Sequence, residues 1–454
     1  MRNGFVIVFC LLVFLLSAQE WKNLLEDNLS NMEKLNGTAE YEYEDGVLIG
    51  IAKAGTPNTF MATKNEFSDF ILEFDVLIDN GMNSGVQFRS LSKDEYFDGR
   101  VHGYQVEIET SLRKWAGGIF DEARRGWLYP LTRSDKSADA FRPGEWNHIR
   151  LEAVGPYIQT WVNGIQCARL VDNMTPKGFI AFQVHSIGDA KHAGKKVRWK
   201  NIRILTEDLE EHLMKPDPSI AQISYLHNEL TPYEINHGWR LLWDGETTEG
   251  WRGAKLDEFP EKGWKMEDGI LTVLSSGGAE SANGGDIVTI KEYSDFELEL
   301  DFKISKGANS GIKYFVDPEL NKGEGSAIGL EFQILDDENH PDAKEGKNGN
   351  RTVGSLYDLI RADNYSEANR GSKRFNGGDQ WNRARILVKD GQVEHWLNGI
   401  KVVSFDRHSQ LFKALVEKSK YENWENFGRI PSGHLLLQDH GDEVSFKNIK
   451  VREF

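Results

Sequence analysis

The sequence predicts an all-β fold built from two β-sandwich domains in tandem, and three observations support this prediction. The 454 residues include 44 Gly, 24 Phe, 13 Tyr and 13 Trp but only 12 Pro, a composition that favours many strands and tight turns over helix bundles. Several runs alternate polar and apolar residues, as half-buried strands do. The chain also repeats itself once, and its length is about twice what a single hydrophobic core serves comfortably.

The N-terminal segment, residues 1–19, is expected to be a secretory signal peptide. Arg2 gives it a positive start, residues 5–16 are almost entirely apolar, and Ser17-Ala18-Gln19 offers small residues for cleavage. The apolar run is too short to span a bilayer well. We therefore expect a secreted protein, periplasmic or extracellular, with no transmembrane segment after signal removal. Cleavage near Ala18 leaves Cys167 alone, which excludes an intramolecular disulfide and a Cys-based metal cluster in the mature chain.

The internal repeat sets the domain boundaries. We expect a first domain over residues 20–205, a linker over 206–237 and a second domain over 238–454. The ordered matches between the copies are Phe67-Ser-Asp-Phe with Tyr293-Ser-Asp-Phe, Asn83-Ser-Gly85 with Asn309-Ser-Gly311, Trp161-Val-Asn-Gly164 with Trp396-Leu-Asn-Gly399, Gln183-Val-His185 with Gln438-Asp-His440, and Lys200-Asn-Ile202 with Lys447-Asn-Ile449.

Local patterns within each copy predict strands in the same order. In the first copy, strands are expected over 70–77, 149–151 and 157–162, and in the second over 296–303, 386–389 and 393–397. Asp390-Gly391 and Asn398-Gly399 are turns whose twist suits hairpins. No segment alternates a strand with a long helix, which argues against a βαβ fold. In the linker, a short helix is expected over 207–214, ending before Pro216, and a helical turn is expected at Thr231-Pro232.

Several motifs resemble the 3-keto-disaccharide hydrolase family, also known as domain of unknown function 1080. The resemblance covers nearly all of the mature chain, because both copies carry the motifs in the same order. It implies two concanavalin A-like jelly rolls and an exported protein that acts on carbohydrate derivatives, by hydrolysis of 3-keto-glycosides or by related elimination chemistry. The motifs are Gly238-Trp-Arg-Leu-Leu-Trp-Asp-Gly245, Ala308-Asn-Ser-Gly-Ile312, Gly329-Leu-Glu-Phe-Gln-Ile-Leu-Asp336, Gly354-Ser-Leu-Tyr357, Leu437-Gln-Asp-His440, Gly103-Tyr-Gln-Val-Glu-Ile-Glu109, Gly118-Ile-Phe-Asp-Glu122 and Arg125-Gly-Trp127.

Strand parity selects candidate site residues. Glu331 and Gln333 share one strand face, opposite the apolar residues at 330, 332 and 334, while Gln438 and His440 share a face of the last strands. For any one of these residues, a plain solvated strand face is the alternative. The combined set suggests a site on one concave sheet of the resembled fold. The first copy has Gln105, Glu107 and Glu109 with Gln183 and His185 in the equivalent places.

The two copies differ where chemistry is expected. Where the second copy has Glu331 and Gln333, the first has Gln105 and Glu107, so the carboxylate and the amide exchange places. Phe120 occupies the position that corresponds to Tyr357. Only the second copy has the polar insertion 336–351, whose length suits a loop over a site. The second copy is therefore expected to hold the more complete site. In the first copy, Asp121, Glu122, Arg124 and Arg125 form either a sugar-binding group or ordinary salt bridges.

A 3-keto sugar requires a particular set of groups. The ketone acidifies the hydrogen at C2, so a carboxylate or neutral His can remove it, and the aglycone at C1 then leaves by β-elimination. Donors, a cation or a divalent metal ion would stabilise the enolate. The resemblance suggests no nucleotide cofactor. The expected catalytic residues are Glu331, His440 and Tyr357; the expected substrate-binding residues are Gln333, Gln438, Arg351, Gln105, Glu107, Arg125, Trp127, Gln183 and His185; the expected metal ligands are Asp336, His340 and His440.

Two other functions remain open at this point. An ordinary glycoside hydrolase on the same fold would carry a Glu-x-Asp-x-x-Glu strand, and the acidic strand 297–301 is instead followed by Phe302 and Lys303. A non-catalytic sugar-binding protein would stack sugars on exposed Trp, for which Trp115, Trp127, Trp251 and Trp424 are candidates. The net charge of −17 argues against a nucleic-acid partner. The expected partner is a small-molecule or oligosaccharide substrate, and the oligomeric state is left open.

Overall fold

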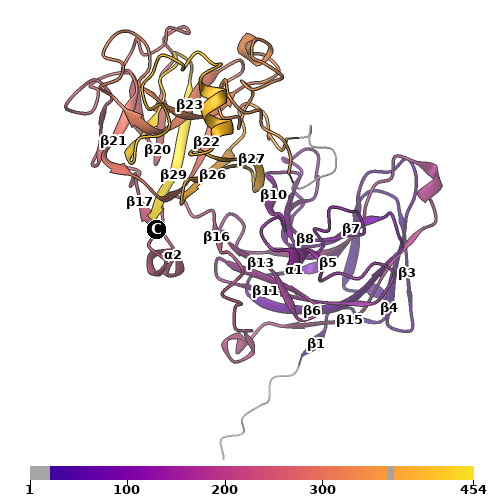
Figure 1. Ribbon diagram of the computed structural model, residues 1–454. Helices are drawn as coiled ribbons and strands as arrows, with labels where there is room; N and C mark the ends of the chain where they lie inside the picture. Colours follow the sequence, from indigo (N-terminus) through magenta and orange to yellow (C-terminus); the bar gives the residue numbers. More distant parts are fainter. Residues whose placement is uncertain (1–20, 366–372) are drawn as a thin grey trace, which may run out of the picture.

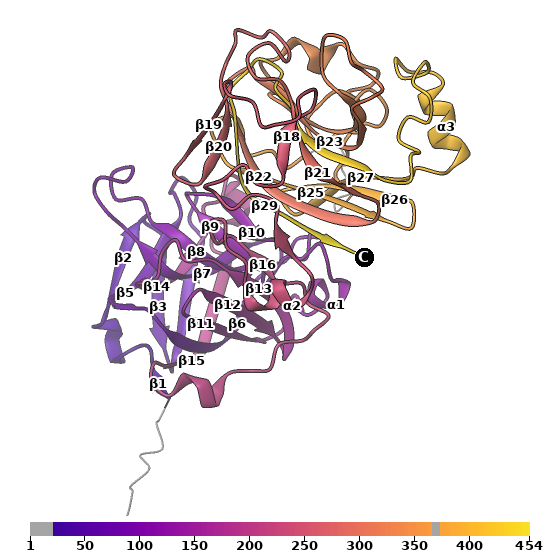
Figure 2. The same cartoon turned by 90° about the vertical axis from the view of Figure 1, so that its left-hand side faces the viewer.

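The computed structural model describes residues 21–365 and 373–454, and the expected signal peptide, residues 1–19, lies outside them. It confirms the predicted fold class. The described residues form two antiparallel jelly-roll sandwiches, joined by a segment that runs between them (Figures 1 and 2).

The first copy pairs a nine-stranded sheet with a seven-stranded sheet within the described residues. The nine-stranded sheet has the order β16 (Ile223–Ser224), β13 (Ile165–Val171), β12 (Tyr157–Val162), β11 (Asn147–Val154), β6 (Phe70–Ile78), β15 (Lys196–Leu205), β4 (Val47–Ile51) and β3 (Glu40–Glu44), with β1 (Lys22–Asn23) also on β15. The seven-stranded sheet has the order β10 (Gly126–Tyr129), β9 (Ile119–Glu122), β8 (His102–Glu109), β7 (Asn83–Leu91), β14 (Gly178–Val184), β5 (Thr59–Phe67) and β2 (Met32–Asn36).

The second copy repeats this plan with an eight-stranded and a five-stranded sheet. The eight-stranded sheet has the order β19 (Trp264–Glu267), β20 (Ile270–Val273), β29 (Val444–Glu453), β22 (Phe296–Ile304), β25 (Asn382–Lys389), β26 (Gln392–Leu397) and β27 (Ile400–Asp406), with β17 (Arg240–Leu241) also on β29. The five-stranded sheet has the order β18 (Trp251–Gly253), β21 (Ile287–Tyr293), β28 (Gly433–Leu437), β23 (Asn309–Asp317) and β24 (Ile328–Leu335).

The alternating runs identified in the sequence are strands in the structure. The expected strand over 157–162 coincides with β12, and the runs beginning at Phe70 and Phe296 form β6 and β22. Apolar faces of the two sheets meet inside each sandwich. Phe74 of β6 contacts Phe182 of β14 in the first copy, and Phe302 of β22 contacts Phe332 of β24 in the second. The outward face of the smaller sheet is thereby left for polar residues.

The helices are short. The helix expected over 207–214 is only a 3-10 turn, because Asp208 has left-handed backbone angles and the chain is extended again at Leu213. The turn expected at Thr231-Pro232 is an α-helix with a full capping box between Thr231 and Glu234. The helices are α1 (Asp135–Ala138), α2 (Pro232–Asn236), α3 (Gln410–Val416), η1 (Asp27–Leu29), η2 (Ala190–His192), η3 (Leu209–His212) and η4 (Pro341–Lys344).

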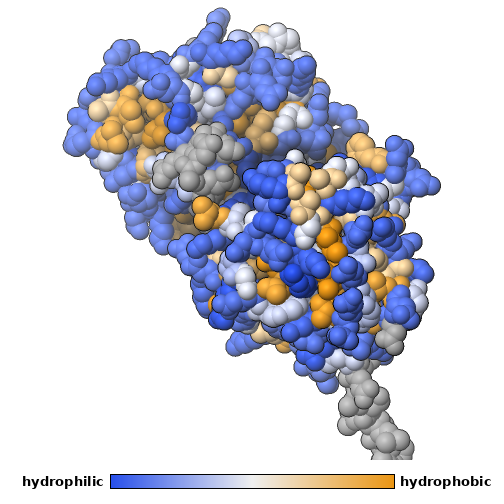
Figure 3. Space-filling model, turned by 90° about the vertical axis from the view of Figure 1, so that its right-hand side faces the viewer, coloured by the Kyte–Doolittle hydropathy of each residue, from blue (hydrophilic) through white to orange (hydrophobic). Residues whose placement is uncertain are grey.

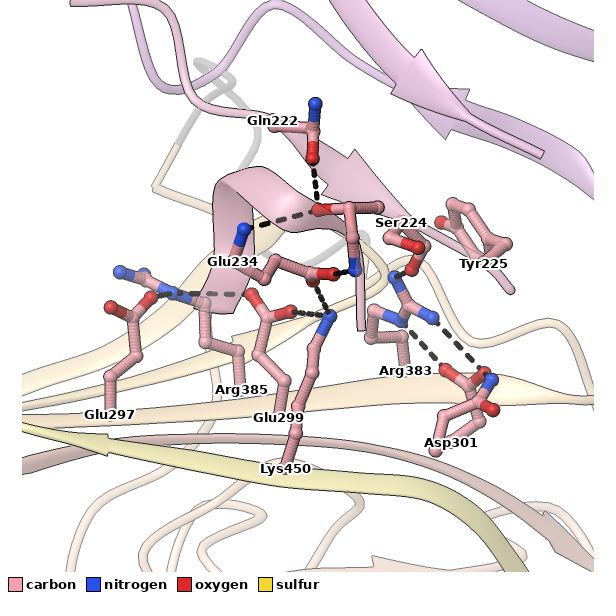
Figure 4. Close-up of polar contacts among 12 residues, drawn as sticks. Gln222, Ser224, Tyr225, Glu234, Glu297, Glu299, Asp301, Arg383, Arg385 and Lys450 are labelled. Carbon is pink, nitrogen blue, oxygen red and sulfur yellow. Dashed lines mark hydrogen bonds and ion pairs between the residues drawn. The ribbon is translucent and has the colours of Figure 1, made fainter. Parts of the chain in front are cut away.

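The connecting segment is packed against both copies. Its strand β16 pairs with β13 of the first copy in parallel, while Glu234 of α2 binds Lys450 of β29 at 2.6 Å. On the same face of the larger second-copy sheet, Arg383 binds Asp301 and donates to the carbonyl of Ser224 (Figure 4). These charges are buried and paired, so the linker covers a sheet face that is lined with ion pairs.

Candidate functional site

A pocket of about 380 Å³ opens on the outward face of the five-stranded sheet in the second copy. We call it the charged pocket. Its floor comes from β23, β24 and the end of β28, and one wall comes from the segment after α3. Five residues selected from the sequence line it: Glu331, Tyr357, Trp424, Gln438 and His440. The lining also includes the side chains of Asn309, Lys313, Glu280, Lys420 and Tyr421.

The Asn309-Ser310-Gly311 motif builds the floor of the charged pocket. The hydroxyl of Ser310 donates to the carbonyl oxygen of Gln438 at 2.9 Å, which ties β23 to β28. A Cβ on Gly311 would lie 2.4 Å from Oε1 of Glu331, so glycine is needed here for the close approach of a side chain. The repeated motif therefore has a structural meaning, because it lets Glu331 lie flat across the neighbouring strand.

Glu331 is the buried acid of the pocket. Burial raises the pKa of its carboxyl, while the positive charges of Lys313, Lys420 and His440 oppose that rise. The amide of Gln333 lies 3.0 Å from Oε1 of Glu331 and 3.0 Å from the carbonyl oxygen of Ser310, so its nitrogen faces these two acceptors. Oε2 lies 3.7 Å from Nζ of Lys313. The carboxylate is thus oriented by neighbours and held in a protein interior that favours proton uptake.

Lys313 is fixed by contacts on the side away from Glu331. Its ammonium donates to the hydroxyl of Ser326 and, at 3.2 Å, to the carbonyl oxygen of Ala327. Ser326 in turn donates to Asp286 at 2.5 Å. Burial raises the pKa of Asp286, and Lys313 is the largest opposing influence. A chain of polar contacts therefore holds a cation in place at the pocket floor.

Tyr357 and Lys420 form the opposite wall. The hydroxyl of Tyr357 donates to Asp342 at 2.9 Å, and burial together with the charges of Glu331 and Asp342 raises its pKa, so this phenol stays protonated. The ammonium of Lys420 lies 4.3 Å from the centre of the Tyr357 ring, a cation–π contact. Burial lowers the pKa of Lys420, and Glu331 is the largest opposing influence.

Arg351 lies behind Tyr357 rather than in the charged pocket. Its guanidinium binds Asp342 at 2.7 Å and Asp358 at 2.8 Å, and it lies 5.5 Å from the centre of the Tyr357 ring. Nη1 of the guanidinium donates to Asp342, and Nε donates to Asp358. These contacts place Arg351 beside Asp342 and Tyr357 and off the lining of the charged pocket, and its role in substrate binding stays a prediction.

His440 and Gln438 line the charged pocket from the segment after β28. Nε2 of His440 lies 3.4 Å from Nδ2 of Asn309, and Nε2 of Gln438 donates to Glu280 at 3.3 Å. Among the described residues, Oε1 of Gln438 is buried without a hydrogen-bond partner. A buried acceptor of this kind is suited to a ligand hydroxyl.

The equivalent side chains of the first copy hydrogen-bond to one another. Gln87 donates to Gln105 at 2.8 Å, and Gln105 donates to Glu107 at 3.1 Å. Gln183 is fully buried beside them, and His185 Nδ1 contacts the carbonyl oxygen of Ser186 at 2.6 Å. Burial lowers the pKa of His185. The structure thus joins Gln105 to Glu107 and places Gln183 across Gly85 from Glu107 in the sheet, and the role of these residues and of His185 in substrate binding stays a prediction.

Arg125 and Trp127 of the first copy are engaged in packing. Arg125 binds Asp121 and Asp172, each at 2.6 Å, which is the salt-bridge alternative for this cluster. Trp127 is buried and makes an edge contact with Trp115 at 4.7 Å. Neither residue is exposed enough to offer an open face to a sugar. Of the four Trp residues considered for stacking, Trp251 is also buried, and Trp424 lines the charged pocket.

The expected metal ligands do not form a metal site in the part of the chain that the structure describes. Asp336 accepts from the backbone of Gly307 and the side chain of Asn339, both at 2.8 Å, and His340 accepts from the backbone of Asp342. Asp336 and His340 therefore make hydrogen bonds that stabilise the backbone of the insertion 336–351 and its neighbours. Of the three expected ligands, only His440 lines the charged pocket. Residues 21–365 and 373–454 hold no group of three or more His, Cys, Asp or Glu side chains arranged for a metal ion. The side chains present therefore do not fit the expected trio.

Sequence reasoning missed Lys313 and Lys420. Lys313 shares strand parity with Asn309 and Gly311, so the alternation of β23 contained the signal for it. Lys420 comes from the segment 407–432, which the first copy replaces by the short connection 172–177 between β13 and β14. Comparison of loop lengths between the copies would have pointed to that segment, although not to its contact with Tyr357.

A profile of the 3-keto-alpha-glucoside-1,2-lyase-like domain matches residues 20–205 and again residues 238–452. The chain belongs to this family. It is 36% identical over 235 residues to a 3-keto-disaccharide hydrolase of Bacteroides thetaiotaomicron, a match that covers 47% of this chain and 78% of the relative. The family and the relative make the chain a hydrolase-like, carbohydrate-active enzyme.

Solved structures are also similar to about half of the chain. A candidate glycosyl hydrolase from Parabacteroides distasonis is 32% identical and has a TM-score of 0.44, covering 50% of this chain and 99% of its own. A second candidate glycosyl hydrolase of that organism is 24% identical, with a TM-score of 0.35, over 48% of this chain and 99% of its own. No helix among the described residues is long and apolar enough to cross a membrane.

Proposed function

We propose that the second copy cleaves 3-keto-glycosides by removing the proton at C2 of the oxidised sugar, with Glu331 as the base. The observation that carries this proposal is the placement of the Glu331 carboxylate on the floor of the charged pocket, buried and flanked by cations. A buried carboxylate with a raised pKa is a stronger base than an exposed one. Its two oxygens have different neighbours, since Oε1 lies beside the amide of Gln333 and Oε2 lies 3.7 Å from Nζ of Lys313.

The two lysine ammonium groups would stabilise the negative charge that the reaction creates on the substrate. When Glu331 takes the C2 proton, the C–H electrons form a C2=C3 double bond and the ketone oxygen becomes an enolate oxygen. The ammonium of Lys313 lies 3.7 Å from Oε2 of Glu331, and both Lys313 and Lys420 line the charged pocket and supply positive charge there. Fixed charge of this kind stabilises an anionic intermediate with little reorganisation.

Cleavage then follows from the enolate. The enolate electrons return to re-form the ketone, a C1=C2 double bond forms, and the C1–O bond breaks. The departing aglycone oxygen takes a proton from protonated Glu331 or from His440 on the pocket lining. Addition of water across C1=C2 gives the free 3-keto sugar, so the net reaction is a hydrolysis. We route no step through a metal ion, because the described side chains do not fit one.

A second cavity beside the charged pocket has room for the aglycone of the substrate. A cavity of about 520 Å³ adjoins the charged pocket and shares Glu280, Glu324 and Gly325 with it. We call it the adjoining cavity. Two linked cavities of this size suit two sugar rings better than one. This supports a disaccharide or larger glycoside as the substrate, a class that agrees with the name of the Bacteroides thetaiotaomicron relative.

The proposed function is tested with purified mature protein, a 3-keto-glucoside and its unoxidised parent glucoside. The 3-keto-glucoside should be cleaved and the parent left intact, because only the ketone acidifies C2. Glu331→Gln should lower turnover by about 10²–10⁴-fold, the factor that general-base catalysis typically contributes. Glu319→Gln, which changes an exposed carboxylate in the loop between β23 and β24, serves as the control.

Other results would contradict the proposal. Cleavage of the parent glucoside at a similar rate would indicate an ordinary glycosidase, and full turnover by Glu331→Gln would remove Glu331 as the base. A parallel reaction with chelator tests the expected metal dependence.

We also propose, from residues 1–19, that the enzyme works outside the cytoplasm, which N-terminal sequencing of the exported protein would test.

A further inference from the structure

The first copy keeps a cavity of its own, of about 490 Å³, at the end of β2 and before β5. We call it the first-copy cavity. It lies at the same place in the jelly roll as the adjoining cavity, because β2 pairs with β5 as β18 pairs with β21, and the loop between β7 and β8 corresponds to the loop between β23 and β24. Both copies therefore retain a cavity beside the outward face of the smaller sheet.

The catalytic groups are absent next to the first-copy cavity. Gln87, Gln105 and Phe120 take the places of Lys313, Glu331 and Tyr357 in the strand register. Only the short connection 172–177 stands where the second copy has the segment that carries Lys420. The amides of Gln87 and Gln105 bond to each other at the register positions of Lys313 and Glu331. The first copy has thus lost the reacting groups while keeping the neighbouring cavity.

An aromatic ring is held out at the rim of the first-copy cavity. Phe97 lines the cavity, yet it is 72% exposed. Its loop is specifically shaped, since Phe97, Asp98 and Gly99 in succession have positive φ angles of 46°, 56° and 78°. Tyr96 supports the ring with an edge contact at 4.9 Å and is itself anchored by a hydrogen bond to the carbonyl oxygen of Ala123. Strained turns that hold a large apolar side chain in water are typical of binding sites.

Polar groups on the wall of the first-copy cavity have few hydrogen-bond partners within the protein. Glu122 is 7% exposed and receives two long contacts, from Asn58 at 3.4 Å and from Arg100 at 3.7 Å. Both contacts reach Oε1, so within the described part of the chain Oε2 has no hydrogen-bond partner. Burial raises the pKa of Glu122. The guanidinium of Arg100 is itself more than half exposed beside it. An acceptor and a donor are therefore available side by side.

We propose that the first-copy cavity is a binding site for a neutral sugar ring, separate from the catalytic site of the second copy. The ring would stack on Phe97, and a pair of vicinal hydroxyls would bond to Glu122 and Arg100. This ligand class fits the wall, because a pyranose has an apolar face and hydroxyls that both donate and accept. An anion is disfavoured by the carboxylates of Glu122 and Asp98. The site would hold one end of a saccharide while the second copy acts on an oxidised sugar.

The experiment measures binding without turnover. Saturation-transfer NMR on the full-length Glu331→Gln protein, with unoxidised cellobiose and maltose as probes, should show transfer to at least one of them. Phe97→Ala and Glu122→Gln should each weaken the measured Kd about tenfold or more. Tyr157→Ala removes an exposed aromatic ring from the larger sheet of the same copy and should leave the Kd unchanged. Thermal melts establish that each variant is folded.

Two results would overturn the inference. One is no transfer to either sugar from the Glu331→Gln protein. The other is binding that survives Phe97→Ala and Glu122→Gln but is lost in Trp424→Ala, which would assign it to the charged pocket. Because the probes carry no ketone, either result is independent of whether 3-keto-glycosides are cleaved.

Discussion

The carboxylate of Glu331 and the ammonium of Lys313 lie 3.7 Å apart on paired strands, and both side chains are buried. In the first copy, the same register positions hold Gln105 and Gln87, which share a neutral hydrogen bond of 2.8 Å. One scaffold therefore carries a charged pair in one copy and a neutral pair in the other. The charged pair is costly to bury, which is expected at a site that uses the charges.

This pair predicts a characteristic double-mutant cycle. Lys313→Gln alone leaves Glu331 buried without its nearest cation, and should destabilise the second copy by about 3 kcal/mol. Combining it with Glu331→Gln recreates the pair of the first copy and should recover most of that loss, while turnover stays abolished. Urea unfolding measures the cycle. Additive losses in the double variant would mean that the two side chains are not coupled.

The pH dependence of turnover should report the environment of Glu331. Since burial raises the pKa of this carboxyl, the base is protonated at low pH, and kcat/KM should rise with pH to a midpoint above the ordinary Glu value of about 4.3. Lys313 opposes the rise, so the residual activity of Lys313→Gln should show a still higher midpoint. A midpoint at or below that of ordinary Glu would argue against Glu331 as the titrating base.

Two matched glycine substitutions distinguish the copies. Gly311→Ala would place a Cβ 2.4 Å from Oε1 of Glu331, and Gly85→Ala would place one 2.3 Å from the side-chain carbon of Gln105. Both variants meet the same crowding on equivalent strands, so similar decreases in Tm are expected. Turnover should fall sharply only in Gly311→Ala, because only there is the base displaced. Equal losses of turnover would place chemistry in both copies.

Glu107 predicts a pH dependence of stability in the first copy. Burial and the neighbouring Glu109 raise its pKa to about 7. Between about 4.5 and 7 the folded state then binds more protons than the unfolded state, so its contribution to stability falls as pH rises through this window, by up to about 3 kcal/mol. The Tm of Glu107→Gln relative to the natural protein should therefore increase from pH 4.5 to 7. A constant difference would contradict the raised pKa.

The sequence predicts the fold well because strand periodicity is local. Alternation locates β6 and β12, and the same period of two places Glu331 and Gln333 on one face before any tertiary contact is known. The repeat then predicts two sandwiches. Tyr357 is a candidate through the family resemblance, and a turn outside the named strands brings its backbone N–H within 3.1 Å of the carbonyl oxygen of Glu331.

Other parts of the site depend on tertiary packing. Lys420 reaches Tyr357 only because its loop folds back through the stack of Tyr421 on Phe427 at 4.1 Å, a contact that no local pattern encodes. The roles of Arg351 and Trp127 were likewise hidden. An Arg in a polar loop and a Trp near a turn have the same local sequence whether they face a ligand or, as here, carboxylates and the core.

The most direct test of the proposed chemistry is proton NMR of a 3-keto-glucoside in deuterated buffer with the natural enzyme and with Glu331→Gln. If Glu331 removes the C2 proton, the natural enzyme should give the 3-keto sugar with deuterium at C2, and a transient C1=C2 alkene signal where hydration is slow. Glu331→Gln should give neither. Cleavage by the natural enzyme with the original hydrogen retained at C2 would contradict proton abstraction and point to direct displacement at C1.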